Sequence, residues 1–151
     1  MSEEEWGVAG EAEQASAGFG RPPLLGVLET VLYFTEAEPT LRFYTDVMGM
    51  KLLAKDAGGR NLFFRAGNSV FLMFDASVTE QGGSLPPHGA TGSGHTCFVV
   101  PAGAYEAWKE HLAGKGVAIL QEVTWPRGLS FYFRDPDSNL LEIANNDIWP
   151  D

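Results

Sequence analysis

The chain has 151 residues, 44% of them hydrophobic, and a formal net charge of −10. This length suits one domain or two small fused modules, and the acidic balance argues against a nucleic-acid-binding protein, which needs a basic patch. The single cysteine, Cys97, excludes an intramolecular disulfide, and no apolar stretch reaches the ~18 residues of a membrane span. The N-terminus lacks the basic and apolar regions of a signal peptide, so we expect a cytoplasmic protein that binds neither nucleic acid nor membranes.

Residues 1–22 form the first distinct segment of the chain. They are rich in Glu, Gly, Ala and Ser, and with five Glu and one Arg they carry a charge of −4. Such a segment buries too little apolar surface to offset its ordering entropy. We therefore predict a disordered acidic tail, followed by a single domain over residues 23–151.

The first half of this domain reads as a βαβββ unit. An apolar run over 24–34 predicts a strand, and Thr35 followed three residues later by Glu38 predicts a helix start with Thr35 as N-cap. The helix is expected to end at Gly49. Turns at glycines then separate three strands, over 50–55, 61–66 and 69–74.

The second half repeats this order after a linker over 77–92 that is rich in Gly and Pro. A strand over 95–100 precedes a helix over 102–114, and a strand over 117–123 follows. The stretch 131–145, FYFRDPDSNLLEIAN, reads as two strands joined by a tight turn of Asp, Pro, Ser and Asn.

The two halves superpose as an internal repeat. Glu29 falls on His95 at an offset of 66 residues, Gly49 falls on Gly114 at 65, and Ser69 falls on Ser138 at 69. We therefore predict an α+β fold of two βαβββ modules, at 24–76 and 93–146, related by a pseudo-twofold. Their sheets are expected to form a cup with the helices outside.

Each of the key strands carries a polar residue within an apolar run: Glu29, His95 and Glu142. At an offset of 69 residues the counterpart of Glu142 is Met73, and alternation along a strand places all four residues on the face opposite the helices. Two carboxylates and an imidazole converging in an apolar cup predict a site for one divalent metal ion, Zn, Ni, Co, Mn or Fe. Glu29 could instead pair with Arg65 or Arg134, and His95 could be a satisfied core histidine.

The repeat, together with the segments FYTDVMGM, HTCFVV and DPDSNLLEI, resembles the vicinal oxygen chelate superfamily. This superfamily includes glyoxalase I, extradiol dioxygenases, fosfomycin-resistance proteins and bleomycin-binding proteins. The resemblance implies ligand positions at Glu29, Met73, His95 and Glu142. Glu29 stands where His is frequent, and Met73 stands where glyoxalase I has its fourth ligand, which argues against true glyoxalase I activity.

The resemblance implies a metal-dependent, glyoxalase-like enzyme, of the lyase, isomerase or dioxygenase class, that acts on a small molecule with vicinal oxygens. Glu29 or Glu142 would serve as catalytic base, and the cup would belong to one chain or be shared by a homodimer. The residues expected to contact the substrate are Tyr33, Met73, Cys97, Trp125 and Arg127. His88 is either a general base or merely exposed. The alternative is a metal-free small-molecule-binding protein of the bleomycin-resistance type.

Overall fold

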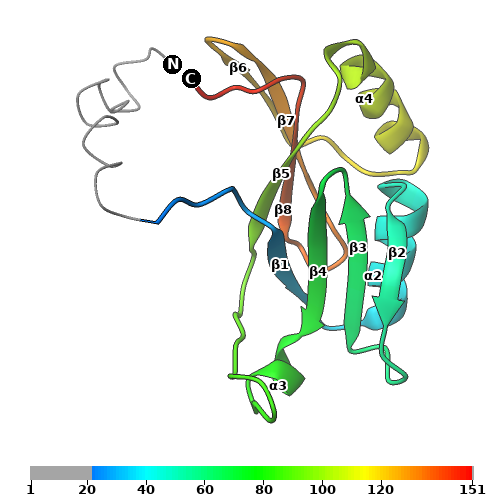
Figure 1. The fold of residues 1–151 in the computed structure, drawn as a ribbon. Helices are drawn as coiled ribbons and strands as arrows, with labels where there is room; N and C mark the ends of the chain where they lie inside the picture. The colour runs from blue at the N-terminus through cyan, green and yellow to red at the C-terminus, as the bar shows by residue number, and fades with distance from the viewer. Residues whose placement is uncertain (1–21, 151) are drawn as a thin grey trace.

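The computed structural model describes residues 22–150 and shows two modules, each with a four-stranded mixed sheet and a helix on one face (Figure 1). The predicted acidic tail lies outside the described residues except for Pro22. No helix among the described residues is long and apolar enough to cross a membrane.

The first module has its strands in the order β1-β4-β3-β2, with β1 parallel to β4 and the other pairs antiparallel. Its elements are β1 (Glu29–Phe34), α2 (Ala37–Arg42), which continues as a π-helical segment (Phe43–Val47), β2 (Lys51–Lys55), β3 (Asn61–Ala66) and β4 (Ser69–Asp75). The predicted strand over 24–34 is therefore shorter, because residues 22–28 precede the sheet without regular structure.

The second module has the same order, β5-β8-β7-β6, with β5 parallel to β8. After a short helix in the linker, α3 (Ala76–Thr79), its elements are β5 (His95–Val99), a 3-10 turn (Ala102–Ala104), α4 (Tyr105–Gly114), β6 (Gln121–Trp125), β7 (Gly128–Arg134) and β8 (Leu140–Ala144). The matching strand orders confirm the prediction of two βαβββ modules.

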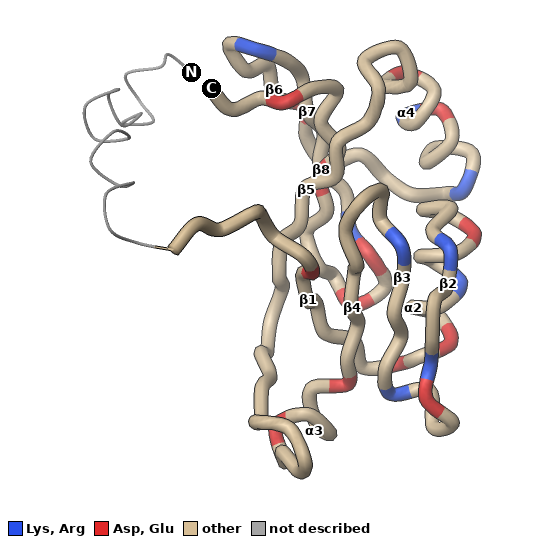
Figure 2. The backbone as a smooth tube through the Cα atoms, in the orientation of Figure 1, with Lys and Arg blue, Asp and Glu red and all other residues tan. Residues whose placement is uncertain are grey.

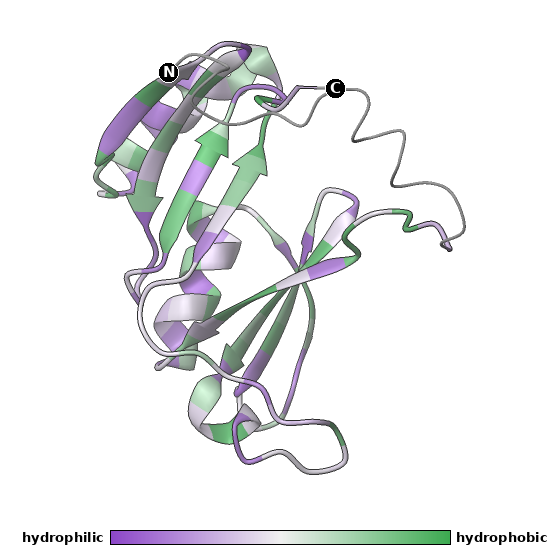
Figure 3. Cartoon of the chain, turned by 90° about the vertical axis from the view of Figure 1, so that its left-hand side faces the viewer, coloured by the Kyte–Doolittle hydropathy of each residue, from purple (hydrophilic) through white to green (hydrophobic). Residues whose placement is uncertain are grey.

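Each sheet has a core face toward the helices and an open face turned away from them (Figure 3). Leu32 and Phe34 of β1 are on the core face of the first sheet, so Glu29, Val31 and Tyr33 are on its open face. In the second sheet Thr96 and Phe98 turn toward the core, and His95, Cys97 and Val99 are on the open face. The described strands form two separate sheets, and β1 and β5 each lie at a sheet edge.

The predicted position of Met73 on the open face is wrong. Met73 pairs with Leu32, and Leu72 pairs with Val31, so Met73 shares the core face with Leu32. Met73 is fully buried in the hydrophobic cluster. Because His95 pairs with Leu140 and Glu29 pairs with Val70, the true offset of the last strands is 70 residues, and the counterpart of Glu142 is Leu72.

The turn after β7 joins the two modules. The buried carboxylate of Asp135 accepts a hydrogen bond from the Tyr44 hydroxyl at 2.7 Å and from the Asn139 backbone N–H at 2.9 Å. Asp137 Oδ1 accepts from both the backbone N–H and the hydroxyl of Thr35. Thr35 is therefore not the helix N-cap that we predicted; the N-cap is Glu36, whose side chain makes no capping hydrogen bond.

Replacing Tyr44 by phenylalanine is expected to lower the free energy of unfolding by about 1.5–3 kcal/mol, because a buried bond to a charged group is lost. That bond stabilises ionised Asp135, whose pKa is raised by burial, so the cost should shrink as the pH falls and Asp135 takes a proton. Tyr105→Phe is the matched control, since the buried Tyr105 hydroxyl has no hydrogen-bond partner among the described residues. Chemical denaturation at two pH values measures both variants, and equal costs would contradict the assignment.

Candidate metal centre

Three strands of the second sheet bring four functional side chains together on its open face. In the strand register Cys97 of β5 and Tyr132 of β7 are both direct neighbours of Glu142 on β8, and His95 lies two residues before Cys97. Alternation along each strand therefore places all four side chains on one face. The sequence predicted this grouping for His95, Cys97 and Glu142 but did not single out Tyr132, which only the pairing of β7 with β8 reveals.

His95 and Glu142 form the centre of this group. His95 Nε2 lies 3.3 Å from Glu142 Oε2, and His95 Nδ1 lies 2.9 Å from the carbonyl oxygen of Leu140. A carbonyl oxygen can only accept, so Nδ1 carries a proton and donates it to Leu140. In the neutral ring the lone pair of Nε2 then faces a carboxylate, an arrangement that a proton or a cation between the two atoms would stabilise.

Glu142 is buried, with 4% of its surface exposed, and its Oε1 atom has no hydrogen-bond partner among the described residues. A buried polar atom without a partner costs free energy, and a buried charge costs more unless it is paired. The described residues therefore leave part of the hydrogen-bonding capacity of this buried carboxylate unused.

The neighbours of Glu142 respond to its charge. Burial, followed by the charge of the nearby Glu142 carboxylate, raises the pKa of the Cys97 thiol to about 12. The pKa of the Tyr132 hydroxyl is raised by burial and by hydrogen bonding to Glu142. The Tyr132 ring stacks on the His95 ring, with 6.1 Å between ring centroids. Both groups are therefore uncharged at neutral pH.

Cys97 is expected to react slowly with iodoacetamide in chelator-treated protein at pH 8. A pKa of about 12, against an ordinary 9.0, leaves about a thousandfold less thiolate at this pH. A more basic thiolate is a stronger nucleophile, which offsets part of the loss in rate. The net reaction should therefore be slower by roughly 30- to 60-fold. Glu142→Gln should speed the reaction, because it removes a charge that raises the pKa. Rates as fast as those of a free cysteine in the unsubstituted protein would contradict the placement of Cys97 beside Glu142.

Glu29 lies apart from this pair within one chain. It is an exposed residue at the start of β1, on the open face of the first sheet. Among the described residues no group of three His, Cys, Asp or Glu side chains could hold a metal ion. The alternative pairing with Arg134 is not seen either, because Arg134 donates to Ser138 O at 2.6 Å and to Ser93 Oγ at 3.1 Å.

The remaining predicted contact residues divide between the two open faces. Trp125 is on the open face of the second sheet and donates through Nε1 to Ser130 Oγ at 2.7 Å, and Arg127 lies in the turn between β6 and β7. Tyr33 is on the open face of the first sheet, where its hydroxyl lies 2.8 Å from Nδ1 of His88. The linker thus folds His88 onto the first sheet, away from His95 on the second.

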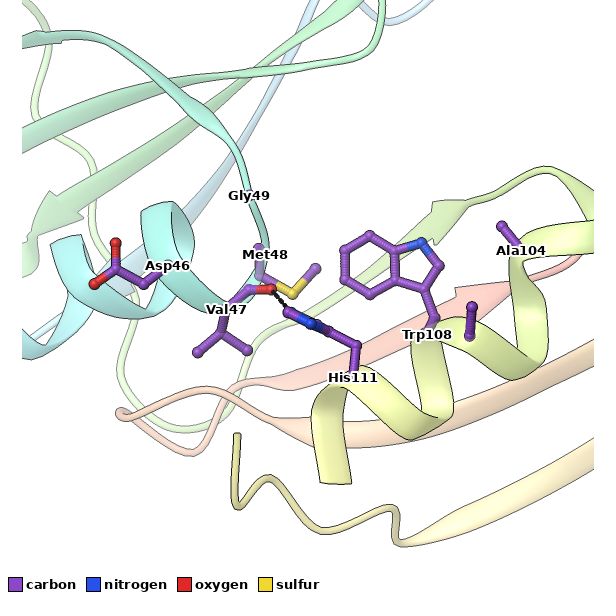
Figure 4. A pocket seen from close by; sticks show the side chains of 8 residues that line it. Asp46, Val47, Met48, Gly49, Ala104, Trp108 and His111 are labelled. Carbon is purple, nitrogen blue, oxygen red and sulfur yellow. Dashed lines mark hydrogen bonds between the residues drawn. The ribbon is translucent and has the colours of Figure 1, made fainter. Parts of the chain in front are cut away.

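Two hollows of similar size lie on opposite sides of the second module. One, of about 410 Å³, lies over its open face and is lined by Leu120, Val123, Trp125, Tyr132 and Leu140 among others. The other, of about 400 Å³, lies between the end of the α2 helix and α4, where His111 Nε2 is 2.8 Å from the carbonyl oxygen of Val47 (Figure 4). Of these two hollows only the first contains a predicted contact residue, Trp125, and it also contains Tyr132, the direct neighbour of Glu142 in the strand register.

Comparison with known proteins agrees with this fold. Residues 26–143 match the Glyoxalase/Bleomycin resistance protein/Dioxygenase superfamily, and the chain belongs to this superfamily. A solved structure of lactoylglutathione lyase from Agrobacterium tumefaciens is 30% identical, with a TM-score of 0.79, and the match covers 84% of this chain and 98% of that one.

Two further proteins resemble this chain less closely. The protein named "Putative ring-cleaving dioxygenase MhqE" of Bacillus subtilis is 27% identical over an alignment of 112 residues. The match covers 70% of this chain and 37% of MhqE, so the chain spans little more than a third of that relative. The fosfomycin resistance protein FosX of Listeria monocytogenes, solved as a mutant with Mn(II) and a dihydroxypropylphosphonic acid, shares the fold at 19% identity and a TM-score of 0.62, covering 82% of this chain and 92% of FosX.

Proposed function

We propose that the protein is a metal-dependent, glyoxalase-like enzyme, of the lyase, isomerase or dioxygenase class, that acts on a small molecule with two adjacent oxygen atoms. The observation that carries this proposal is the His95 and Glu142 pair, with its unsatisfied buried carboxylate oxygen. The similarity to a lactoylglutathione lyase and to MhqE supports the reaction classes.

The donor set fits a divalent metal ion. A ligating histidine commonly donates its other ring N–H to a backbone carbonyl, as His95 does to Leu140. Two ligands of one tetrahedral ion at ~2.0–2.1 Å are about 3.3–3.4 Å apart, and the Nε2 to Oε2 separation is 3.3 Å. The pair therefore has the spacing and the protonation that two ligands need.

The third ligand, Glu29, would come from a second copy of the chain. Glu29 occupies in the first module the strand position that His95 occupies in the second, yet one chain does not gather three donors in its described residues. A twofold dimer that places the open face of one chain's first sheet against the open face of the other's second sheet would bring them together. Each dimer would then hold two sites.

A metal ion bound here would act as a Lewis acid on the two substrate oxygens. Glu29 or Glu142 would take a proton from the substrate, because each is a carboxylate on the open face. Trp125 and Tyr132 line the hollow next to Glu142 and would bind the body of the substrate. Tyr33, Cys97 and Arg127 would complete its surroundings, with Arg127 favouring an anionic group. Buried Met73 has no place in this set.

A metal-free small-molecule-binding protein of the bleomycin-resistance type is the second candidate. The observation in its favour is that the described residues of one chain contain no group of three metal donors. The apolar hollow lined by Trp125 and Tyr132 would serve as the ligand groove. This candidate leaves the buried carboxylate of Glu142 without an explanation.

Mixing two inactive variants tests the proposal. Glu29→Ala and Glu142→Ala homodimers should each bind no Zn²⁺ or Mn²⁺, whereas heterodimers formed after mixing should contain one intact site made of unsubstituted residues from both chains. Isothermal titration calorimetry should then show about one metal ion per heterodimer. If the mixture binds no metal although the unsubstituted protein does, a centre shared between two chains is excluded. If the unsubstituted protein itself binds no divalent ion, the metal-free candidate is favoured.

A further inference from the structure

The segment 22–28, which we call the arm, is the most exposed apolar feature of the described chain. It leaves the start of β1 and runs away from both modules (Figures 1 and 3). Its large apolar side chains are exposed by 95%, 104%, 78% and 76% at Leu24, Leu25, Val27 and Leu28. The arm has no charged residue (Figure 2). A contiguous apolar surface of this kind marks an interaction site in a folded protein.

The edge of β5 is a second unpartnered feature. β5 is hydrogen-bonded to β8 on one side only, which leaves the backbone groups of its other side free to pair. Val99, near the end of this strand, is 70% exposed on the open face. A free edge with an exposed β-branched residue is a template for adding a strand from another chain.

We propose that the arm of one chain pairs with the free edge of β5 in a second copy of the chain. This inference rests on the proposed shared site and extends it. The two modules have the same strand order, so a local pseudo-twofold between the first module of the partner subunit and the second module of this chain would bring Glu29 of the partner subunit next to His95. The two strands that begin at these residues would then run antiparallel away from this local axis. The arm, which precedes Glu29, must then run back along β5 from His95 toward Val99.

The register follows by counting outward from the Glu29 and His95 positions. Val27 of the partner subunit comes opposite Cys97, and Leu25 of the partner subunit comes opposite Val99. Alternation keeps Leu25, Val27 and Glu29 on one face, which is the face that carries His95 and Val99 in β5. The two most exposed apolar side chains of these segments, Leu25 and Val99, thus meet as a cross-strand pair.

The net negative charge of the chain favours an apolar contact between two copies. Each chain has a formal net charge of −10, so two copies repel each other at neutral pH. An uncharged arm against an uncharged strand edge avoids this repulsion, and burial of its side chains drives the association. Because the dimer has a twofold axis, the contact forms twice, and each chain both donates an arm and receives one.

Sedimentation velocity over a dilution series tests the contact in the full chain. Leu25→Ser and Val99→Ser should each weaken dimerisation at least tenfold, and the double variant should be weakened by less than the product of the two effects, because the residues touch. Leu85→Ser is the matched control, since Leu85 is an exposed leucine of the linker, 75% exposed, and should leave the dimer unchanged. A chain that stays monomeric, or a dimer insensitive to Leu25→Ser and Val99→Ser, would overturn the proposal.

A disulfide trap separates this inference from the metal site. In a Cys97→Ala background, Leu25→Cys with Val99→Cys should form interchain disulfides on oxidation, and Leu85→Cys with Val99→Cys should not. A crosslinked dimer that binds no Zn²⁺ would refute the metal function but keep the arm contact. A dimer that binds Zn²⁺ and forms no crosslink would refute the arm contact alone.

Discussion

Glu142→Gln is expected to lower the affinity for Zn²⁺ or Mn²⁺ by at least a hundredfold while leaving the metal-free protein as stable as before, or more so. The amide keeps the shape of the side chain but loses the charge that binds a cation. In the metal-free protein that charge is a cost, because Oε1 is buried without a partner. The amide nitrogen can also donate to the Nε2 lone pair of His95, which now faces a carboxylate at 3.3 Å.

Calorimetry of chelator-treated protein, with and without metal, measures both halves of this prediction. At a free concentration of a hundred times the dissociation constant, metal should stabilise the unsubstituted protein by about 2.7 kcal/mol, a rise in Tm of roughly 10 °C. Glu142→Gln should lose this rise, and the exposed Glu110→Gln should keep it. If the unsubstituted protein gains nothing from any divalent ion and Glu142→Gln is simply more stable, the metal-free candidate leads.

The repeat and the alternation along strands were enough to predict most of this fold from the sequence. The turn residues between β7 and β8 and the polar residue within the apolar runs of β5 and β8 are strong local signals, so the shared face of His95 and Glu142 follows from them. The partner of Glu142 on β7 could not be found in this way, because Tyr132 is one of several aromatic residues in its strand. Only the cross-strand register singles it out.

The error at Met73 has a physical origin. β4 is apolar over Val70 to Phe74, so its sequence does not alternate and does not reveal which residues face the helices. A shift of one residue in the assumed repeat then exchanges the two faces of the strand. The wrong prediction of Thr35 as helix N-cap has a similar cause. Its hydrogen-bond partner, Asp137, is 102 residues away in the other module, so no local pattern in the sequence reveals the contact.

Met73→Ala is the substitution that tests the corrected register most directly, and it should lower the free energy of unfolding by about 2–5 kcal/mol. Met73 is fully buried beside Leu32 and in the same cluster as Phe71, so truncation leaves a cavity that rigid neighbours cannot fill. For a domain of this size the loss corresponds to a fall in Tm of roughly 8–20 °C. Met73→Leu keeps the volume and should cost less than about 1.5 kcal/mol.

A metal titration of Met73→Ala shows whether Met73 only packs in the hydrophobic core or also contributes to the metal site. Well below its Tm, Met73→Ala should bind Zn²⁺ with nearly the affinity of the unsubstituted protein, because Met73 is on the face opposite Glu29 in the sheet register. Urea denaturation and metal titration of the same preparation give both values. A small loss of stability with a large loss of metal affinity would return Met73 to the open face. It would also restore the originally predicted offset of 69 residues between Met73 and Glu142. Both the face of Met73 and this offset depend on the pairing of Met73 with Leu32.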